Sequence, residues 1–325
     1  MKTTNPIFVT GIYRSGTTLI SRMLNNHPDL SITYDSVHFM RFSFNNYNPV
    51  QNESNYLKLI TEISERIKKR WDLTLDTDNI VKKIKQCKVP DYSIIYDTIM
   101  SSLLLQNSNA KHWGEKTNVC WRKIPDFLSM FPDGKTILMI RDPRDVFLSY
   151  KKMTTEPGLR YTDSAFACLD SFKIAKKYLN ELDDDRFCII KYEELVANPV
   201  PILNRICNFL EIQYDPIMLE SEKFKDKSGN AWESNTSFSE KMQGISQNAV
   251  SRWKKSISNV ELFFIEMILR EQIQEFDYEL GAIPLTKSEW DELFTILNDD
   301  FVKDRYRYWL KTGQGHQKYP NEPLE

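Results

Sequence analysis

The sequence has no long apolar run, few cysteines and little net charge. None of its apolar stretches reaches the roughly 18 residues that indicate a membrane-spanning helix, so no span is expected. The net charge of −2 provides no global basic field for nucleic acid. The five cysteines include no C-x-x-C pair, so neither a disulfide framework nor a zinc site is indicated. We therefore expect no metal, no nucleic-acid partner and no membrane span.

The start of the chain also lacks an apolar run ahead of the first predicted strand. A secretory signal peptide needs such a run, so we expect a cytoplasmic location. The 325 residues are enough for one large α/β domain with a substantial core. We predict a single domain over residues 1–325, with a helical insertion at about 40–110 and a C-terminal helical extension at about 286–325.

A loop bounded by glycines stands near the start of the chain. This glycine-bounded loop (residues 11–18) reads Gly-Ile-Tyr-Arg-Ser-Gly-Thr-Thr. An apolar run at 7–10 predicts a strand before it, and helical spacing at 19–24 predicts a helix after it. That order directs backbone N–H groups and a helix N-terminus at one point, which suits a phosphate. The spacing matches a nucleotide phosphate loop, except that Thr17 replaces the Walker lysine and Arg14 is the nearest cation.

Strand-like and helix-like patterns alternate along the rest of the chain. Short apolar runs predict further buried strands at residues 30–33, 136–140 and 187–190. The alternation predicts an α/β fold of three layers, in which a mostly parallel sheet is flanked by helices. Near the C-terminus, residues 287–310 predict one amphipathic helix.

Ligands of such sheets bind at the carboxyl ends of the strands. The glycine-bounded loop, Asp35, Lys116 and Arg141 all fall near the ends of predicted strands. We therefore expect these residues to converge at one site.

Two segments resemble sulfotransferases that use 3′-phosphoadenosine 5′-phosphosulfate (PAPS). Residues 8–24 resemble the 5′-phosphosulfate loop of that family, and residues 140–150 resemble its 3′-phosphate motif. The resemblance continues from about residue 163 to 258, and the motifs are most similar to the tyrosylprotein and carbohydrate branch. It implies a P-loop NTPase-like sulfotransferase fold. It also implies metal-free transfer of a sulfuryl group from PAPS to a hydroxyl or amine, leaving adenosine 3′,5′-bisphosphate (PAP).

The same resemblance implies which residues bind the cofactor. They are Arg14, Ser15, Gly16, Thr17 and Thr18 at the 5′-phosphate, Arg141 and Ser149 at the 3′-phosphate, Tyr192 after a strand, and Ser237, Arg252 and Lys254 in a C-terminal lid. Tyr192 has an alternative role, which is only to close its strand.

Three residues are candidates for catalysis: Asp35, Lys116 and Arg14. Lys116 resembles the family lysine that contacts the transferring group. Asp35 stands where tyrosylprotein sulfotransferases have a glutamate base, although an ion pair with an arginine is an alternative. His38 and His112 are rival bases, because cytosolic sulfotransferases use histidine.

Two other functions stay open at this point. A P-loop kinase of a small molecule would use a similar loop, but the missing lysine argues against it. A non-catalytic nucleotide- or glycan-binding module would keep the fold without the chemistry. The acceptor could be a small molecule, a carbohydrate or a peptide, and the helical insertion is expected on the acceptor side.

Overall fold

The central element of the fold is a parallel sheet. The structure is a computed structural model that describes residues 5–104, 109–153, 158–224 and 245–315. Its five strands run in the order β2-β3-β1-β4-β5, and all four neighbouring pairs are parallel. The strands are β1 (Ile7–Gly11), β2 (Leu30–Tyr34), β3 (His112–Lys116), β4 (Lys135–Ile140) and β5 (Phe187–Lys191). The predicted parallel α/β architecture is confirmed.

Thirteen α-helices are present in the described ranges. They are α1 (Thr17–Asn25), α2 (Glu53–Trp71), α3 (Thr77–Lys85), α4 (Tyr92–Leu104), α5 (Ile124–Met130), α6 (Pro143–Met153), α7 (Asp163–Glu181), α8 (Tyr192–Ala197), α9 (Pro199–Phe209), α10 (Trp253–Ser256), α11 (Asn259–Glu275), α12 (Lys287–Asn298) and α13 (Asp300–Thr312). None of those described is both long and apolar enough to cross a bilayer.

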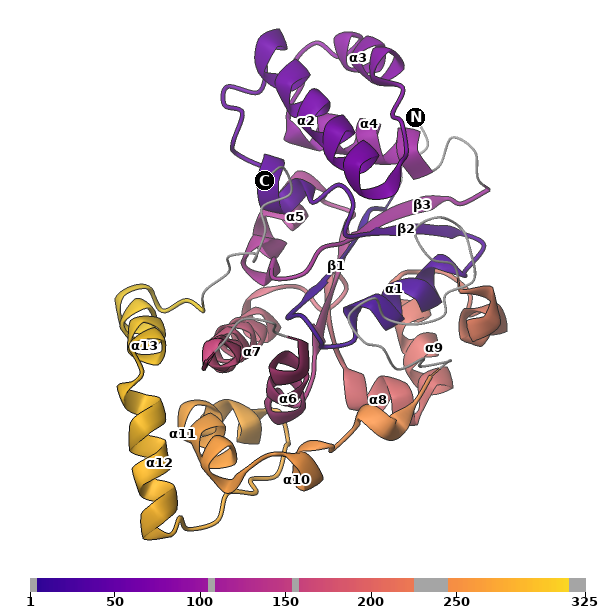
Figure 1. Cartoon of the computed structure of the whole chain (residues 1–325). Coiled ribbons are helices and arrows are strands. Elements are labelled where there is room, and N and C mark those ends of the chain that lie inside the picture. Colours follow the sequence, from indigo (N-terminus) through magenta and orange to yellow (C-terminus); the bar gives the residue numbers. More distant parts are fainter. Residues whose placement is uncertain (1–4, 105–108, 154–157, 225–244, 316–325) are drawn as a thin grey trace.

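The sheet has a hydrophobic core on each face, because successive side chains of a strand point to opposite sides. On β1, Phe8 belongs to one core, whereas Ile7 and Val9 belong to the other. Helices α1, α8 and α9 cover the face of Ile7 and Val9 (Figure 1). Helices α5, α6, α7 and α11 lie on the face of Phe8. The result is the expected three-layer arrangement.

The predicted insertion at 40–110 contains α2, α3 and α4, which lie together beyond the β2–β3 side of the sheet (Figure 1). Helix α4 packs against β2 and β3. Its Tyr96 stacks on Phe39, with ring centroids 4.0 Å apart, and its hydroxyl donates to the buried carboxylate of Glu115 on β3. The insertion is therefore attached to the strand that ends at Lys116.

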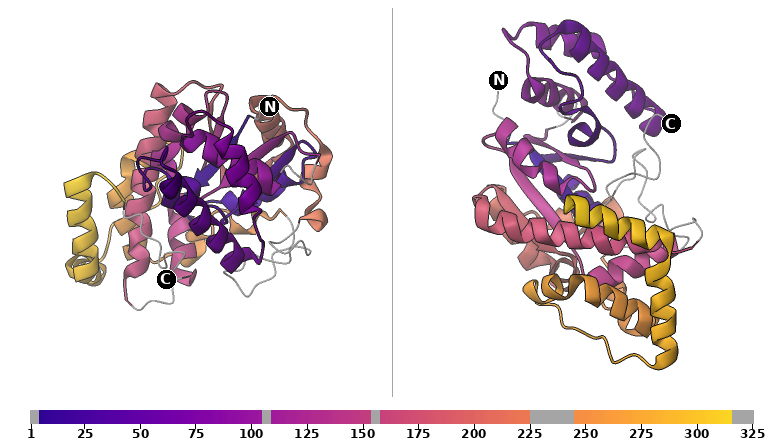
Figure 2. Two further views of the ribbon diagram at one scale, coloured as in Figure 1. Left: turned by 90° about the horizontal axis from the view of Figure 1, so that it is seen from above. Right: turned by 90° about the vertical axis from the view of Figure 1, so that its left-hand side faces the viewer.

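The prediction of one helix over residues 287–310 is wrong. Helices α12 and α13 meet at an angle (Figure 2), and the break lies at Asp299. This residue is extended, with φ −60° and ψ 135°, and its carboxylate accepts the N–H groups of Phe301 and Val302. An aspartate that satisfies the first N–H groups of a helix favours a new start there. Apolar spacing alone does not show such a break.

Candidate functional site

The carboxyl ends of all five strands lie along one edge of the sheet. The glycine-bounded loop follows β1, Asp35 follows β2, Lys116 ends β3, Arg141 follows β4 and Tyr192 follows β5. The parallel pairing therefore brings together residues that are far apart in the sequence.

The glycine-bounded loop is shaped by its own hydroxyl groups. Ser15 donates to the carbonyl of Ile12 through both its N–H (3.2 Å) and its Oγ (2.7 Å). The Oγ1 of Thr17 donates to Asn118 Oδ1 at 2.7 Å. Gly16 is the N-cap of helix α1, so no side chain caps the start of the helix. Because the first N–H groups of a helix have no acceptor within it, they can bind an anion here.

Gly16 is required at its position for two reasons. Its φ of 94° is in the left-handed region, which side chains disfavour. A Cβ there would also lie 2.4 Å from Cδ2 of Tyr192. Tyr192 thus packs against the loop. The guanidinium carbon of Arg141 lies over its ring, 4.5 Å from the centroid. These contacts give Tyr192 a role in shaping the loop that neither predicted alternative included, and contact with the nucleotide stays a prediction.

Three arginines form a guanidinium cluster (Arg14, Arg141 and Arg252) beside the loop. Arg14 Nε donates to Ser149 Oγ, and Arg141 Nη1 donates to the carbonyl of Arg14, both at 2.9 Å. Burial, followed by the charges of Arg141 and Arg252, lowers the pKa of Arg14 to about 10. Within the described chain, the buried Nε of Arg141 has no hydrogen-bond partner. Mutually repelling cations with an unpaired buried donor fit an anion with several oxygens.

Asp35 and Lys116 form an ion pair at the ends of neighbouring strands. Lys116 Nζ lies 2.5 Å from Asp35 Oδ2, and the lysine side chain is 0% exposed while that of the aspartate is 34% exposed. Burial is the largest single effect and raises the pKa of Asp35. The charges of Lys116, His38 and Arg70, with the hydrogen bond from Lys116, together outweigh it, so the pKa is below its usual value. Among the described residues, no donor reaches Asp35 Oδ1. An ionised carboxylate with an unused oxygen can accept a proton.

The two rival histidines lie in different surroundings. His38 is buried, and its Nε2 lies 3.0 Å from Nη1 of Arg70. Burial and the charge of Arg70 lower the pKa of His38 to about 3. Because an arginine can only donate, its N–H occupies the lone pair of Nε2, which therefore cannot take a proton from an acceptor. His112 begins β3, at the end of the strand opposite to Lys116. The geometry therefore favours Asp35 over both histidines.

Besides Arg252, the other two predicted lid residues are Lys254 and Ser237. Lys254 is exposed, and its ammonium is 5.6 Å from the ring centroid of Trp253. Ser237 lies outside the described residues. Arg252 is described, and its charge acts on Arg14 in the cluster.

Sequence reasoning missed the residues that hold the site together. Asp142 Oδ2 accepts from the indole of Trp253, and Asp145 accepts two N–H groups of the same segment. On the other side, Glu115 accepts the N–H groups of His38 and Phe39. These contacts join residues about 76 to 111 positions apart. No local pattern reveals them.

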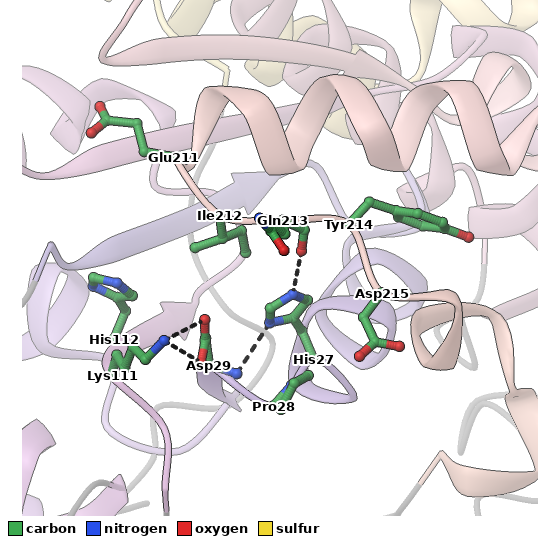
Figure 3. A pocket seen from close by; sticks show the side chains of 10 residues that line it. All are labelled: His27, Pro28, Asp29, Lys111, His112, Glu211, Ile212, Gln213, Tyr214 and Asp215. Atoms are coloured by element: carbon green, nitrogen blue, oxygen red, sulfur yellow. Dashed lines mark hydrogen bonds and ion pairs between the residues drawn. The ribbon is translucent and has the colours of Figure 1, made fainter.

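A cleft of about 440 Å³ lies at the opposite end of the sheet (Figure 3). It is lined by residues before β2, residues at the start of β3 and the segment after α9. Its polar groups bind one another: Lys111 lies 2.9 Å from Asp29, and His27 Nε2 lies 2.7 Å from the carbonyl of Gln213. His112 is in this cleft.

Comparison with known proteins adds independent information. A model of the Sulfotransferase family matches residues 6–216. The protein-tyrosine sulfotransferase of Drosophila melanogaster is 25% identical over 261 residues, which cover 76% of this chain and 46% of the relative. Protein-tyrosine sulfotransferase 1 of Danio rerio is 27% identical over 260 residues, which cover 76% of this chain and 65% of the relative. The chain thus spans about half to two thirds of the length of these relatives.

A solved structure shares the fold. The sulfotransferase domain from the Synechococcus PCC 7002 olefin synthase superposes with a TM-score of 0.59 over 86% of this chain and 98% of that domain, at 18% identity. This likeness confirms the predicted sulfotransferase-type architecture.

Replacing Gly16 with alanine is expected to destroy the loop. The new Cβ would collide with Tyr192, so both stability and affinity for PAP should fall. Gly158→Ala is the matched control, because Gly158 also has a positive φ (79°) but nothing lies within 4 Å of a Cβ there. The control should cost only about 1–2 kcal/mol of unfolding free energy, the strain of the left-handed backbone. Chemical denaturation and calorimetry with PAP measure both effects, and equal losses in the two variants would contradict the proposed packing.

Proposed function

Because the chain belongs to the sulfotransferase family, we propose that it transfers a sulfuryl group from PAPS to an acceptor hydroxyl. One observation carries this proposal. The uncapped N-terminus of α1 and the guanidinium cluster meet at the same sheet edge as the Lys116–Asp35 pair. This edge combines a phosphate site with a cation and a proton acceptor, which is what transfer to a hydroxyl requires.

The residues present fit a nucleotide with phosphates on both the 3′ and 5′ positions. Both phosphates of PAP are attached to one ribose, so two adjacent anion sites are needed. The glycine-bounded loop and Arg141 are adjacent, since Arg141 donates to the carbonyl of Arg14 within that loop. The unpaired Nε of Arg141 supports an additional phosphate contact. PAPS would supply a sulfuryl group attached to its 5′-phosphate.

Lys116 and Asp35 are assigned complementary roles. The acceptor oxygen forms a bond to sulfur while the bond from sulfur to the 5′-phosphate oxygen breaks. The ammonium of Lys116 would stabilise the negative charge on that leaving oxygen. The carboxylate of Asp35 would take the proton of the acceptor hydroxyl. The 2.5 Å contact between them keeps the base ionised before the reaction.

Two competing functions have less support. A kinase would need a lysine where Thr17 stands. Thr17 instead bonds to Asn118 within the protein. A purely binding module would have no use for a buried lysine beside an ionised carboxylate. The cytoplasmic location and the metal-free chemistry expected from the sequence stay predictions.

Nucleotide selectivity tests the proposal directly. PAP should bind tightly in calorimetry without Mg²⁺, whereas ATP should bind weakly, because ATP has no 3′-phosphate for Arg141. Arg141→Ala should weaken the affinity for PAP by about 10- to 100-fold, because a hydrogen bond to a charged group is lost. AMP is the matched ligand, and its affinity should fall less than that of PAP in this variant, because AMP has no 3′-phosphate contact to lose. Equal affinity of the wild-type protein for PAP and ATP would overturn the assignment.

The proposed acceptor is the hydroxyl of a peptide tyrosine. Its support is the names of the relatives, which are protein-tyrosine sulfotransferases. Labelled sulfate from PAPS should appear in a tyrosine peptide but not in the same peptide with phenylalanine. Labelling of sugars or small alcohols in place of the peptide would reject this acceptor while keeping the reaction.

The base can be identified from one variant and one pH profile. Asp35→Asn should lower kcat by roughly 10²–10⁴-fold while PAP affinity is retained. Because the pKa of Asp35 is below its usual value, the carboxylate stays ionised on acidification, and kcat/KM should not fall between about pH 7 and pH 5. A base with the ordinary histidine pKa of about 6.5 would instead lose activity over that range. An active Asp35→Asn enzyme would rule out Asp35.

A further inference from the structure

One buried carboxylate near Arg141 has no part in the proposed chemistry. Asp145 lies in the first turn of α6 and is 0% exposed. Its Oδ2 accepts the N–H of Ser251 at 2.7 Å, and its Oδ1 accepts the N–H of Trp253 at 2.9 Å. These two residues flank Arg252. One side chain therefore fixes both ends of the three-residue turn that carries this arginine.

The conformation of that turn requires an external partner. Ser251 has a φ of 55°, in the left-handed region that residues with a Cβ rarely adopt. Hydrogen bonds to an ionised carboxylate are stronger than neutral ones and can stabilise such a backbone. Without Asp145, the turn would be expected to relax to other conformations.

The turn lies beside the proposed phosphate site. Arg141 Nη2 donates to the carbonyl of Ala249, two residues before Ser251. The charge of Arg252 contributes to the lowered pKa of Arg14. Burial raises the pKa of Tyr192, and the charge of Arg252 opposes this rise. The ring of Tyr192 packs against Gly16. Arg252 is thus close enough to the glycine-bounded loop for its charge to act on Arg14 and Tyr192.

Trp253 is anchored independently of Asp145. Its indole N–H donates to Asp142 at 2.9 Å, and the guanidinium carbon of Arg144 lies 3.7 Å from its ring centroid. Loss of the Asp145 contacts would therefore free the turn around Arg252 while the following helix stays docked.

We propose that Asp145 is a positioning residue that holds Arg252 in place to bind a phosphate of the nucleotide. Asp145 itself does not touch the nucleotide and acts on Arg252 through the turn, while its Oδ2 also lies 4.0 Å from Nη2 of Arg141. This inference rests on the proposed function, because it needs a phosphate ligand at the cluster.

A double-mutant cycle tests the inference. The dissociation constant of PAP is measured by calorimetry for the wild type, Asp145→Asn, Arg252→Ala and the double variant. Each single substitution should raise the dissociation constant of PAP by about tenfold or more. The double variant should bind no more weakly than Arg252→Ala alone, since residues that act as a unit are not additive. In turnover, KM for PAPS should rise in Asp145→Asn while kcat at saturation is retained.

A control separates positioning from general stability. Asp170 is equally buried and accepts from Trp121 and Arg122. Asp170→Asn should lower the melting temperature without changing PAP affinity. If Asp145→Asn fails to fold, Asp145→Glu keeps the charge and serves in the same cycle.

The outcomes are distinct. Additive losses in the double variant, or unchanged PAP affinity in Asp145→Asn, would overturn the positioning role. A wild-type protein that binds no PAP would instead overturn the proposed function.

Discussion

The side chain of Arg141 is the contact on which the candidate site depends. It follows strand β4 and donates to the carbonyls of Arg14 in the loop and Ala249 in the C-terminal part of the chain. Its guanidinium also lies over Tyr192, which begins α8. One cation therefore joins three segments that are distant in the sequence. A buried charge of this kind is costly unless it is well compensated. Asp145, 4.0 Å away, supplies one compensating charge, and a phosphate would supply another.

The Lys116–Asp35 pair follows a similar logic at the neighbouring strands. A fully buried ammonium is unfavourable without an anion nearby. The carboxylate of Asp35 fills this requirement, and its partial exposure leaves it accessible to an acceptor. The pair is thus stable as a resting state and suitable for chemistry, because the same short contact that offsets burial also keeps the base ionised.

Much of the site was predictable because it follows from topology. In a parallel sheet, residues just after the strands share one edge, so the loop, Asp35, Lys116 and Arg141 could be grouped from strand patterns alone. The contacts that position these side chains were not predictable, since they join distant residues such as Asp145 and Ser251. Ser15 and Thr17 were predicted to bind the 5′-phosphate through their loop amides, which stays a prediction; that their hydroxyls bond within the protein was not predicted. The break at Asp299 was missed because both helices keep the same apolar spacing.

Glu115 gives strand β3 a second role. It precedes Lys116 and points to the other face of the sheet, where it binds Tyr96 of α4 and the N–H groups that begin the turn at Phe39. The insertion is therefore tied to the residue next to the proposed catalytic lysine. Chimeras that exchange the insertion between relatives would disturb this junction. A change in the insertion is thus transmitted to the end of β3, and divergence of one constrains divergence of the other.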